Sequence, residues 1–257
     1  MAVSLSSASL ALANASPTSV AQEDPTTAAL NKLSPALGKA HERVRSQLQS
    51  DSTSLSQLGQ YKATVSNLSV AAQALGQLDA STSVTSGVQT VERFVAAYNQ
   101  AIVASQAGAS GDTANTLAAS RRHLTNTETS RSQLAKLGLS RQPDGTLKLD
   151  TTALKNALSA GSASATASGA TSTTSAGLST LAQLGKAIGK RAASELSSSS
   201  RIATATSLYT DKASLLKRQQ SRLQEVATQL AAQASTTAST SSTSDWRTQQ
   251  ALRTYTS

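Results

Sequence analysis

The chain has 257 residues, of which 38% are hydrophobic, many of them alanine, and 2% are aromatic. Alanine buries little apolar area, so narrow seams of Leu, Val and Ile between long helices are expected in place of a large globular core. The lack of cysteine excludes a disulfide scaffold and any cysteine-based metal or nucleophile site. A net charge of +9 fits polyanion binding, but the basic residues are scattered, and solvated helix faces explain them more economically.

The N-terminal part of the chain is predicted to be a disordered tail followed by a helical arm. Residues 1–30 are rich in Ser, Ala and Thr without apolar periodicity, and they lack the positive region of a general secretory signal peptide. Residues 31–80 are predicted to form a heptad helix arm. Apolar residues recur in it three and four positions apart, at Leu55, Leu58, Tyr61, Val65, Leu68, Ala72, Leu75 and Leu78.

Residues 88–160 are predicted to form a small inner helical domain. A helix over 89–103 carries two aromatic side chains on one face, and a more polar helix follows over 116–137. Pro143-Asp144-Gly145 predicts a turn before a short strand, and Asp150 is a good N-cap for the helix that starts at Thr151. The predicted inner-domain core consists of Phe94, Tyr98, Leu137, Leu147, Leu149 and Leu154.

The same turn segment has a competing interpretation as a calcium loop. Asp144 and Asp150 flank it, but Leu147 and Leu149 stand where oxygen ligands are needed. The structural interpretation, a turn followed by an N-cap, is therefore favoured.

The C-terminal part begins with a low-complexity linker over 161–176 and continues as a second heptad helix arm over 177–234. One seam position is apolar every seven residues, at Ile202, Tyr209, Leu216, Leu223 and Leu230. The other holds Ala205 and Val226 but also Lys212, Gln219 and Gln233. This predicts a helix that packs in an assembly and is weak alone. Residues 235–257 are predicted to be a flexible tail with a short helix near its end.

The sequence has no motif that indicates catalysis, a metal or a cofactor. It contains no HExxH, GxSxG, P-loop or GxGxxG pattern. Its two histidines, His41 and His123, are far apart and are predicted to lie on the surface. No stretch approaches the length of a membrane span. An enzyme is therefore the least expected class.

Four segments together resemble the flagellar hook-associated protein 2 family, the filament cap proteins of bacterial flagella. The most specific is LAKLGLSRQPDGTLKLDTTALKNAL, which is preceded by VERFVAAYN. SLSQLGQYKATVSNLSVAAQALGQL resembles the first arm of the family through Leu58, Gly59, Lys62 and Ser66, and KASLLKRQQSRLQEVATQL resembles the returning arm. Only residues 79–90 stand where the family carries its β-rich outer domains, so the chain resembles a shortened form.

The resemblance and the periodicity lead to one expected architecture. The fold class is mainly α: an elongated helical bundle of coiled-coil arms, with a small helical inner domain that carries one short β-hairpin-like segment, and with disordered tails. The resemblance implies a non-enzymatic structural subunit, exported without a general secretory signal and extracellular at the filament tip. It also implies homo-oligomers, with flagellin, hook–filament junction proteins and an export chaperone as partners.

Two other classes remain open at this point. One is a secreted interaction or adhesin-like protein, or a cap paralogue that has lost capping. The other is a basic helical protein that binds polyanions, since residues 186–222 carry eight basic side chains.

Overall fold

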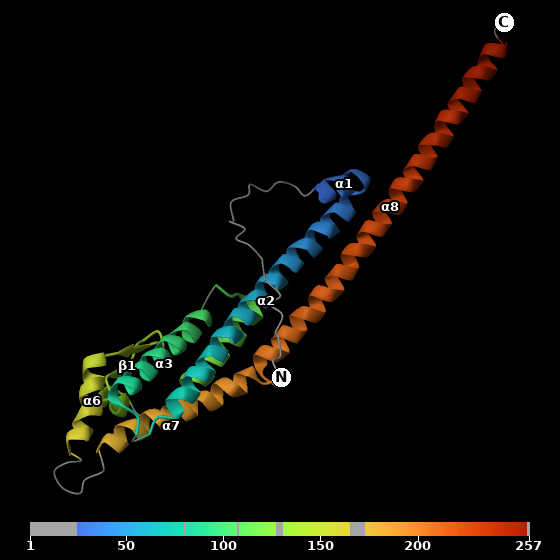
Figure 1. Ribbon diagram of the computed structural model, residues 1–257. Helices are drawn as coiled ribbons and strands as arrows, with labels where there is room; N and C mark the ends of the chain where they lie inside the picture. The colour runs from blue at the N-terminus through green and yellow to red at the C-terminus, as the bar shows by residue number, and fades with distance from the viewer. Residues whose placement is uncertain (1–24, 80, 107, 127–130, 165–172, 256–257) are drawn as a thin grey trace, which may run out of the picture. The chain divides into compact units, whose positions relative to one another are not determined.

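The computed structural model describes residues 25–79, 81–106, 108–126, 131–164 and 173–255 (Figure 1). The predicted mainly helical fold with one short hairpin is confirmed. The helices are α1 (Pro25–Leu33), α2 (Pro35–Gly76), α3 (Val84–Ala104), α4 (Gly111–Thr125), α5 (Arg131–Lys136), α6 (Thr151–Ser164), α7 (Thr173–Leu196) and α8 (Arg201–Tyr255). In the described ranges the strands are β1 (Leu139–Arg141) and β2 (Leu147–Leu149).

The chain divides into a larger unit of residues 46–218 and a smaller unit of residues 1–45 and 219–257. The predicted arms 31–80 and 177–234 each contribute residues to both units. The predicted tail 1–30 lies mostly outside the described residues, and so does the middle of the predicted linker 161–176. Residues 235–244, predicted to be flexible, continue α8 as helix, since extending an existing helix is far easier than starting one.

The apolar residues that recur along α2 lie in the core of the larger unit. The α2 residues Leu58, Val65, Leu68 and Leu75 are fully buried, and they pack with α3, α4 and α7 inside this unit. Of the predicted inner-domain core, Leu149 is partly buried, and the buried members are Phe94, Tyr98, Leu137, Leu147 and Leu154. The Phe94 and Tyr98 rings lie 6.0 Å apart between centroids, a distance typical of a tilted aromatic pair.

The hairpin of β1 and β2 forms around the turn that Pro143-Asp144-Gly145 predicts. Gly145 N donates to Gln142 O (3.0 Å), which closes the turn, and Gly145 has φ +90°, a conformation that glycine adopts without strain. Asp144 Oδ1 accepts hydrogen bonds from the hydroxyl and the N–H of Thr146, which hold the pKa of Asp144 below its usual range. Asp150 Oδ1 accepts from Ala153 N (2.9 Å) and caps α6, so both aspartates serve local backbone structure.

One side chain joins the hairpin to α3. Asn99 donates from Nδ2 to Leu147 O (2.8 Å) and accepts from Leu147 N at Oδ1 (2.7 Å). It thus satisfies the outward-facing backbone groups of β2, which pairs with β1 on its other edge. The helix that contains FVAAYN and the strand that contains LKL are therefore held in one register.

Helices α2 and α7 approach each other closely because small residues face one another. A Cβ atom added to Gly185 would lie 2.5 Å from Gly76 N and 2.7 Å from Ala72 O. Real Cβ atoms do not approach backbone atoms so closely, so Gly185 is required at this crossing. The crossing sets the distance between the two helices.

The second seam position of α8 agrees with the prediction at Ala205, which is partly buried against the core, and differs from it farther along the helix. Val226 is 43% exposed, whereas the next residue, Ala227, is buried. The less exposed positions follow the first seam residue by four places, at Thr206, Ala213, Gln220 and Ala227. These side chains are small or polar, so an apolar pattern does not single them out. Of the first seam, Ile202 and Tyr209 are buried, Leu216 and Leu223 are partly buried, and Leu230 is 38% exposed.

In the smaller unit, His41 is buried and not at the surface as predicted. Its side chain is 1% exposed, and Nδ1 lies 3.1 Å from Thr27 Oγ1. The contact joins α1 to the first turns of α2. The polar residues that follow His41 in the sequence are exposed, so they give no sign that the histidine itself is buried.

The glycine crossing gives a matched test. Gly185→Ala is expected to lower the free energy of unfolding by about 1–2 kcal/mol, because overpacking at the backbone outweighs the gain in helix propensity. Gly59→Ala is the control: this α2 glycine has no neighbour within 4 Å, and alanine should raise stability by about 0.5–1 kcal/mol. Urea unfolding followed by circular dichroism measures both. A stabilising Gly185→Ala would contradict the close crossing.

Candidate functional site

Helix α4 presents a buried seam in which polar and apolar residues alternate. Thr113, Leu117, Ser120 and Leu124 follow one another at spacings of four, three and four, and each is fully buried. This is heptad spacing. The two polar members reach other helices: Thr113 Oγ1 donates to the Tyr209 hydroxyl of α8 (2.9 Å), and Ser120 reaches α7.

The centre of this arrangement is the carboxylate of Glu195 on α7, which is 5% exposed. Ser120 Oγ donates to Oε2 (2.7 Å), and His123 Nδ1 lies 2.8 Å from Oε1, so an Nδ1 proton is donated to the carboxylate. The His123 side chain is 38% exposed. His123 is therefore not the simple surface histidine that the sequence predicts, but half of a partly buried pair.

Tyr61 of α2 closes the cluster from the other side. Its ring is fully buried, and its hydroxyl has no hydrogen bond of good geometry. Burial, and then the negative charge of Glu195, raise the pKa of Tyr61 far above its usual value, although the nearby Ser120 hydroxyl offsets part of the rise. The phenol therefore stays protonated and neutral, and α2, α4 and α7 meet at one polar point inside the core.

These residues do not have the arrangement of a hydrolytic triad. In a triad the histidine lies between the hydroxyl and the acid, so that it can accept the hydroxyl proton. Here Glu195 lies between Ser120 and His123, and Ser120 is fully buried. The cluster holds a buried charge and joins helices.

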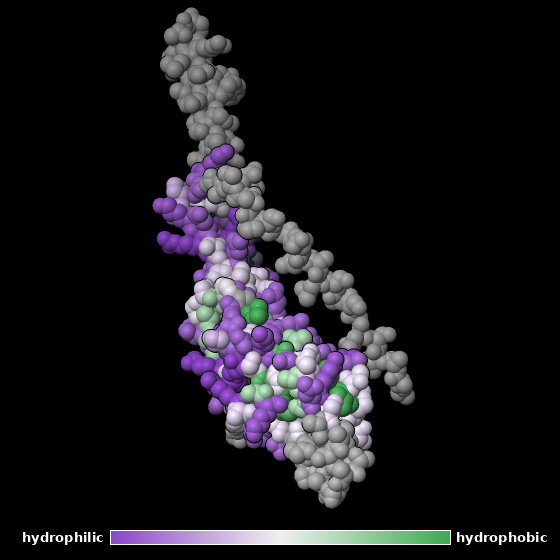
Figure 2. Space-filling view, turned by 90° about the vertical axis from the view of Figure 1, so that its left-hand side faces the viewer, coloured by the Kyte–Doolittle hydropathy of each residue, from purple (hydrophilic) through white to green (hydrophobic). Residues whose placement is uncertain are grey.

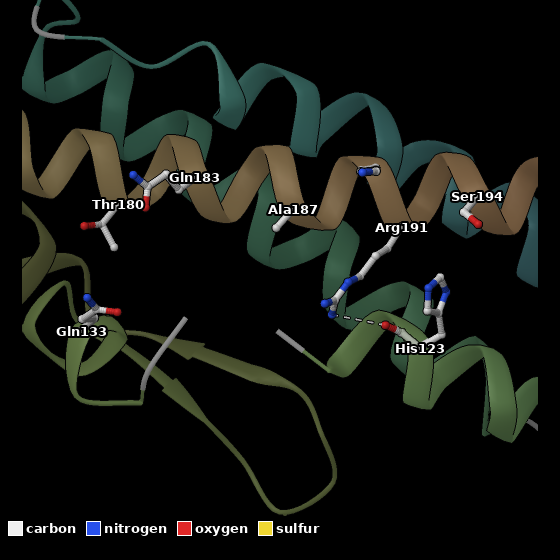
Figure 3. Close-up of a pocket in the computed structure, with 8 residues that line it drawn as sticks. His123, Gln133, Thr180, Gln183, Ala187, Arg191 and Ser194 are labelled. Carbon is white, nitrogen blue, oxygen red and sulfur yellow. Dashed lines mark hydrogen bonds between the residues drawn. The ribbon is translucent and has the colours of Figure 1, made fainter. Parts of the chain in front are cut away.

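A pocket of about 660 Å³ opens beside this cluster (Figure 3). One wall is a face of α7, and His123 of α4 and Gln133 of α5 lie opposite it. Arg191 Nη1 donates to the His123 carbonyl across the pocket at 3.4 Å, a long hydrogen bond. The described residues that line it are His123, Gln133, Thr180, Gln183, Ala187, Lys190, Arg191 and Ser194.

No protein-family model, curated protein or solved structure matches the chain. Within the described ranges, no three His, Cys, Asp or Glu side chains are grouped so as to hold a metal ion. None of the helices in the described part of the chain combines the length and the apolar character needed to cross a membrane.

Sequence reasoning did not find the members of this cluster as a group. The four–three–four spacing of α4 could have identified Ser120, had polar residues been accepted as seam members. Glu195 follows Ile188 by seven residues and so continues the buried face of α7. Neither pattern reveals that the two side chains meet, since they are 75 positions apart.

The cluster predicts opposite outcomes for two hydroxyl deletions. Ser120→Ala removes a donor from a buried carboxylate and is expected to lower the free energy of unfolding by about 1–3 kcal/mol. Tyr61→Phe removes a buried hydroxyl without a hydrogen bond and should leave stability unchanged or slightly higher. Chemical denaturation of both variants measures the difference. Equal losses of unfolding free energy in both variants would contradict the different roles assigned to the Ser120 and Tyr61 hydroxyls.

Proposed function

We propose that the chain is a non-enzymatic structural subunit of the flagellar hook-associated, filament-cap-like kind, which acts by helical self-assembly. The observation that carries the proposal is the contact between the two most specific segments of the resemblance. Asn99, the last residue of FVAAYN, bonds both backbone groups of Leu147 in DGTLKLD. The two segments thus depend on each other, as expected of one inherited unit and not of two chance matches.

Exposed apolar side chains on α8 support self-assembly. In the larger unit, Leu208 is 47% and Leu215 is 56% exposed. They are seven residues apart and therefore share a face of the helix, next to the face that buries Ile202 and Tyr209. On the face drawn in Figure 2, hydrophobic side chains occur in small groups among hydrophilic ones. A second apolar face on a long helix fits a partner helix from another copy.

In this proposal the subunit is exported and works outside the cell at the filament tip. Its partners are further copies of itself, flagellin or hook–filament junction proteins, and an export chaperone. The long helices, with polar residues in their seams, suit a chain that becomes fully stable only in an assembly.

A second candidate function rests on the connection between α2 and α3. In the family that the chain resembles, the β-rich outer domains would stand at this connection. Helix α2 ends at Gly76 and α3 begins at Val84, so only a short connection stands in their place. This favours a cap paralogue, or a secreted interaction protein, that assembles without capping a filament.

Self-assembly through α8 is tested by charge insertion. The double variant Leu208→Asp with Leu215→Asp is expected to weaken association at least about tenfold, because each change removes buried apolar area and places a charge at the interface. Ser207→Asp with Ser214→Asp adds the same charge at neighbouring exposed positions and should leave association unchanged. Sedimentation velocity over a concentration series measures both. A wild-type monomer at all concentrations, or equal losses in both variants, would contradict self-assembly through this face.

Complementation separates the two candidate functions. A strain without its filament cap should regain filament growth with the wild-type chain and not with the Leu208→Asp, Leu215→Asp variant. If the wild-type chain assembles but restores no filament, the cap paralogue without capping is the correct function.

A further inference from the structure

The exposed apolar face of α8 carries two opposite charges beside its leucines. Leu208 and Leu215 lie seven residues apart and form a line along the helix, the leucine line. Asp211 and Lys212 stand between the two leucines in the sequence, and both are exposed. Because an α-helix has 3.6 residues per turn, Asp211 lies on one side of the leucine line and Lys212 on the other. The line is therefore flanked by an anion and a cation at nearly the same height.

The two charges are available to a second helix. Adjacent residues of a helix do not face each other, so Asp211 and Lys212 do not neutralise each other within one copy. Lys212 Nζ lies 5.2 Å from the centre of the Tyr209 ring, and Tyr209 is buried against the core. An ammonium group has three N–H donors, and contact with the face of one ring leaves N–H groups for a carboxylate.

The flanks of the leucine line determine how a second α8 helix packs on it. In a parallel pair of identical helices, the left flank of one faces the right flank of the other, whereas in an antiparallel pair like flanks meet. With both leucines in contact, a parallel pair places Asp211 opposite Lys212 of the second copy, and the twofold symmetry repeats the contact. An antiparallel pair places Asp211 beside Asp211 and Lys212 beside Lys212. Charges that flank a helical seam set its orientation in this way.

The apolar contact is short. Arg201 precedes Leu208 by seven residues, and Arg222 follows Leu215 by seven, so the leucine line ends in an arginine at both ends. Arginine meets arginine there in either orientation, so Asp211 and Lys212 decide between the two. Two layers of leucine bury far less than the roughly 800 Å² per partner of a standard interface. The contact is therefore weak by itself and reversible.

We propose that α8 pairs with α8 of a second copy, parallel and in register. Leu208 and Leu215 each pack on the same residue of the second copy, and two Asp211–Lys212 ion pairs join the copies. The proposal rests on the self-assembly proposed above, and it specifies the partner helix, its direction and its register.

Charge reversal in the full chain tests the direction. Asp211→Lys places lysine opposite lysine on both flanks of a parallel pair and should weaken dimerisation about tenfold. Asp211→Lys with Lys212→Asp restores opposite charges and should return the dissociation constant to within about threefold of wild type. In an antiparallel pair like charges meet in all three proteins, so neither variant would differ from wild type. Sedimentation velocity over a concentration series measures the constants, and circular dichroism checks the fold.

Introduced cysteines test the register independently, since the chain has no cysteine of its own. Arg201→Cys should give a disulfide-linked dimer on oxidation, because the parallel register places this position against itself. An antiparallel pair with both leucines in contact places it opposite position 222, about 31 Å from its own counterpart. Thr210→Cys is the control: this exposed position lies on the opposite side of α8 from the leucine line, and it should give no such dimer.

The outcomes separate this proposal from the self-assembly on which it rests. If association depends on Leu208 and Leu215 but is unchanged by Asp211→Lys, and Arg201→Cys gives no disulfide, self-assembly stands and the parallel pairing is overturned. If the wild-type chain is a monomer at every concentration, another molecule or segment covers this face, and both proposals fail.

Discussion

The burial of the Glu195 carboxylate is the constraint on which the packing of the larger unit depends. A buried charge costs several kcal/mol unless its oxygens are hydrogen-bonded. Both oxygens find their partners on α4, at Ser120 and His123, within 2.8 Å. A shift of α4 along α7 by one turn would separate both contacts and leave the charge unpaired. The carboxylate therefore fixes one register of the two helices, more specifically than an apolar seam would.

The register has consequences on both sides of the cluster. On the inner side it places Tyr61 of α2 against the same point, while the Gly76–Gly185 crossing sets the distance between α2 and α7. On the outer side it holds His123 opposite Arg191, at one wall of the pocket beside α7 (Figure 3). A polar contact in the core thus helps to position one wall of the pocket beside α7.

The parts of the fold that depend on local chemistry could be predicted from the sequence. The Pro143-Asp144-Gly145 turn, the Asp150 cap and the α2 seam follow from turn geometry and apolar spacing within a few residues. The polar cluster could not be predicted, because Ser120 and Glu195 are distant in sequence and polar residues in a seam weaken the apolar pattern. In α8, heptad spacing predicts Val226 in the second seam, whereas the structure buries its neighbour Ala227.

The central claim, that Glu195 fixes α4 through Ser120, is tested most directly by a double-mutant cycle. Glu195→Leu removes both carboxylate oxygens and keeps most of the side-chain volume. If the contact is direct, Ser120→Ala should be nearly neutral in the Glu195→Leu background, with a coupling energy of about 1–2 kcal/mol from urea unfolding. Additive effects, with no coupling beyond about 0.3–0.5 kcal/mol, would contradict the claim.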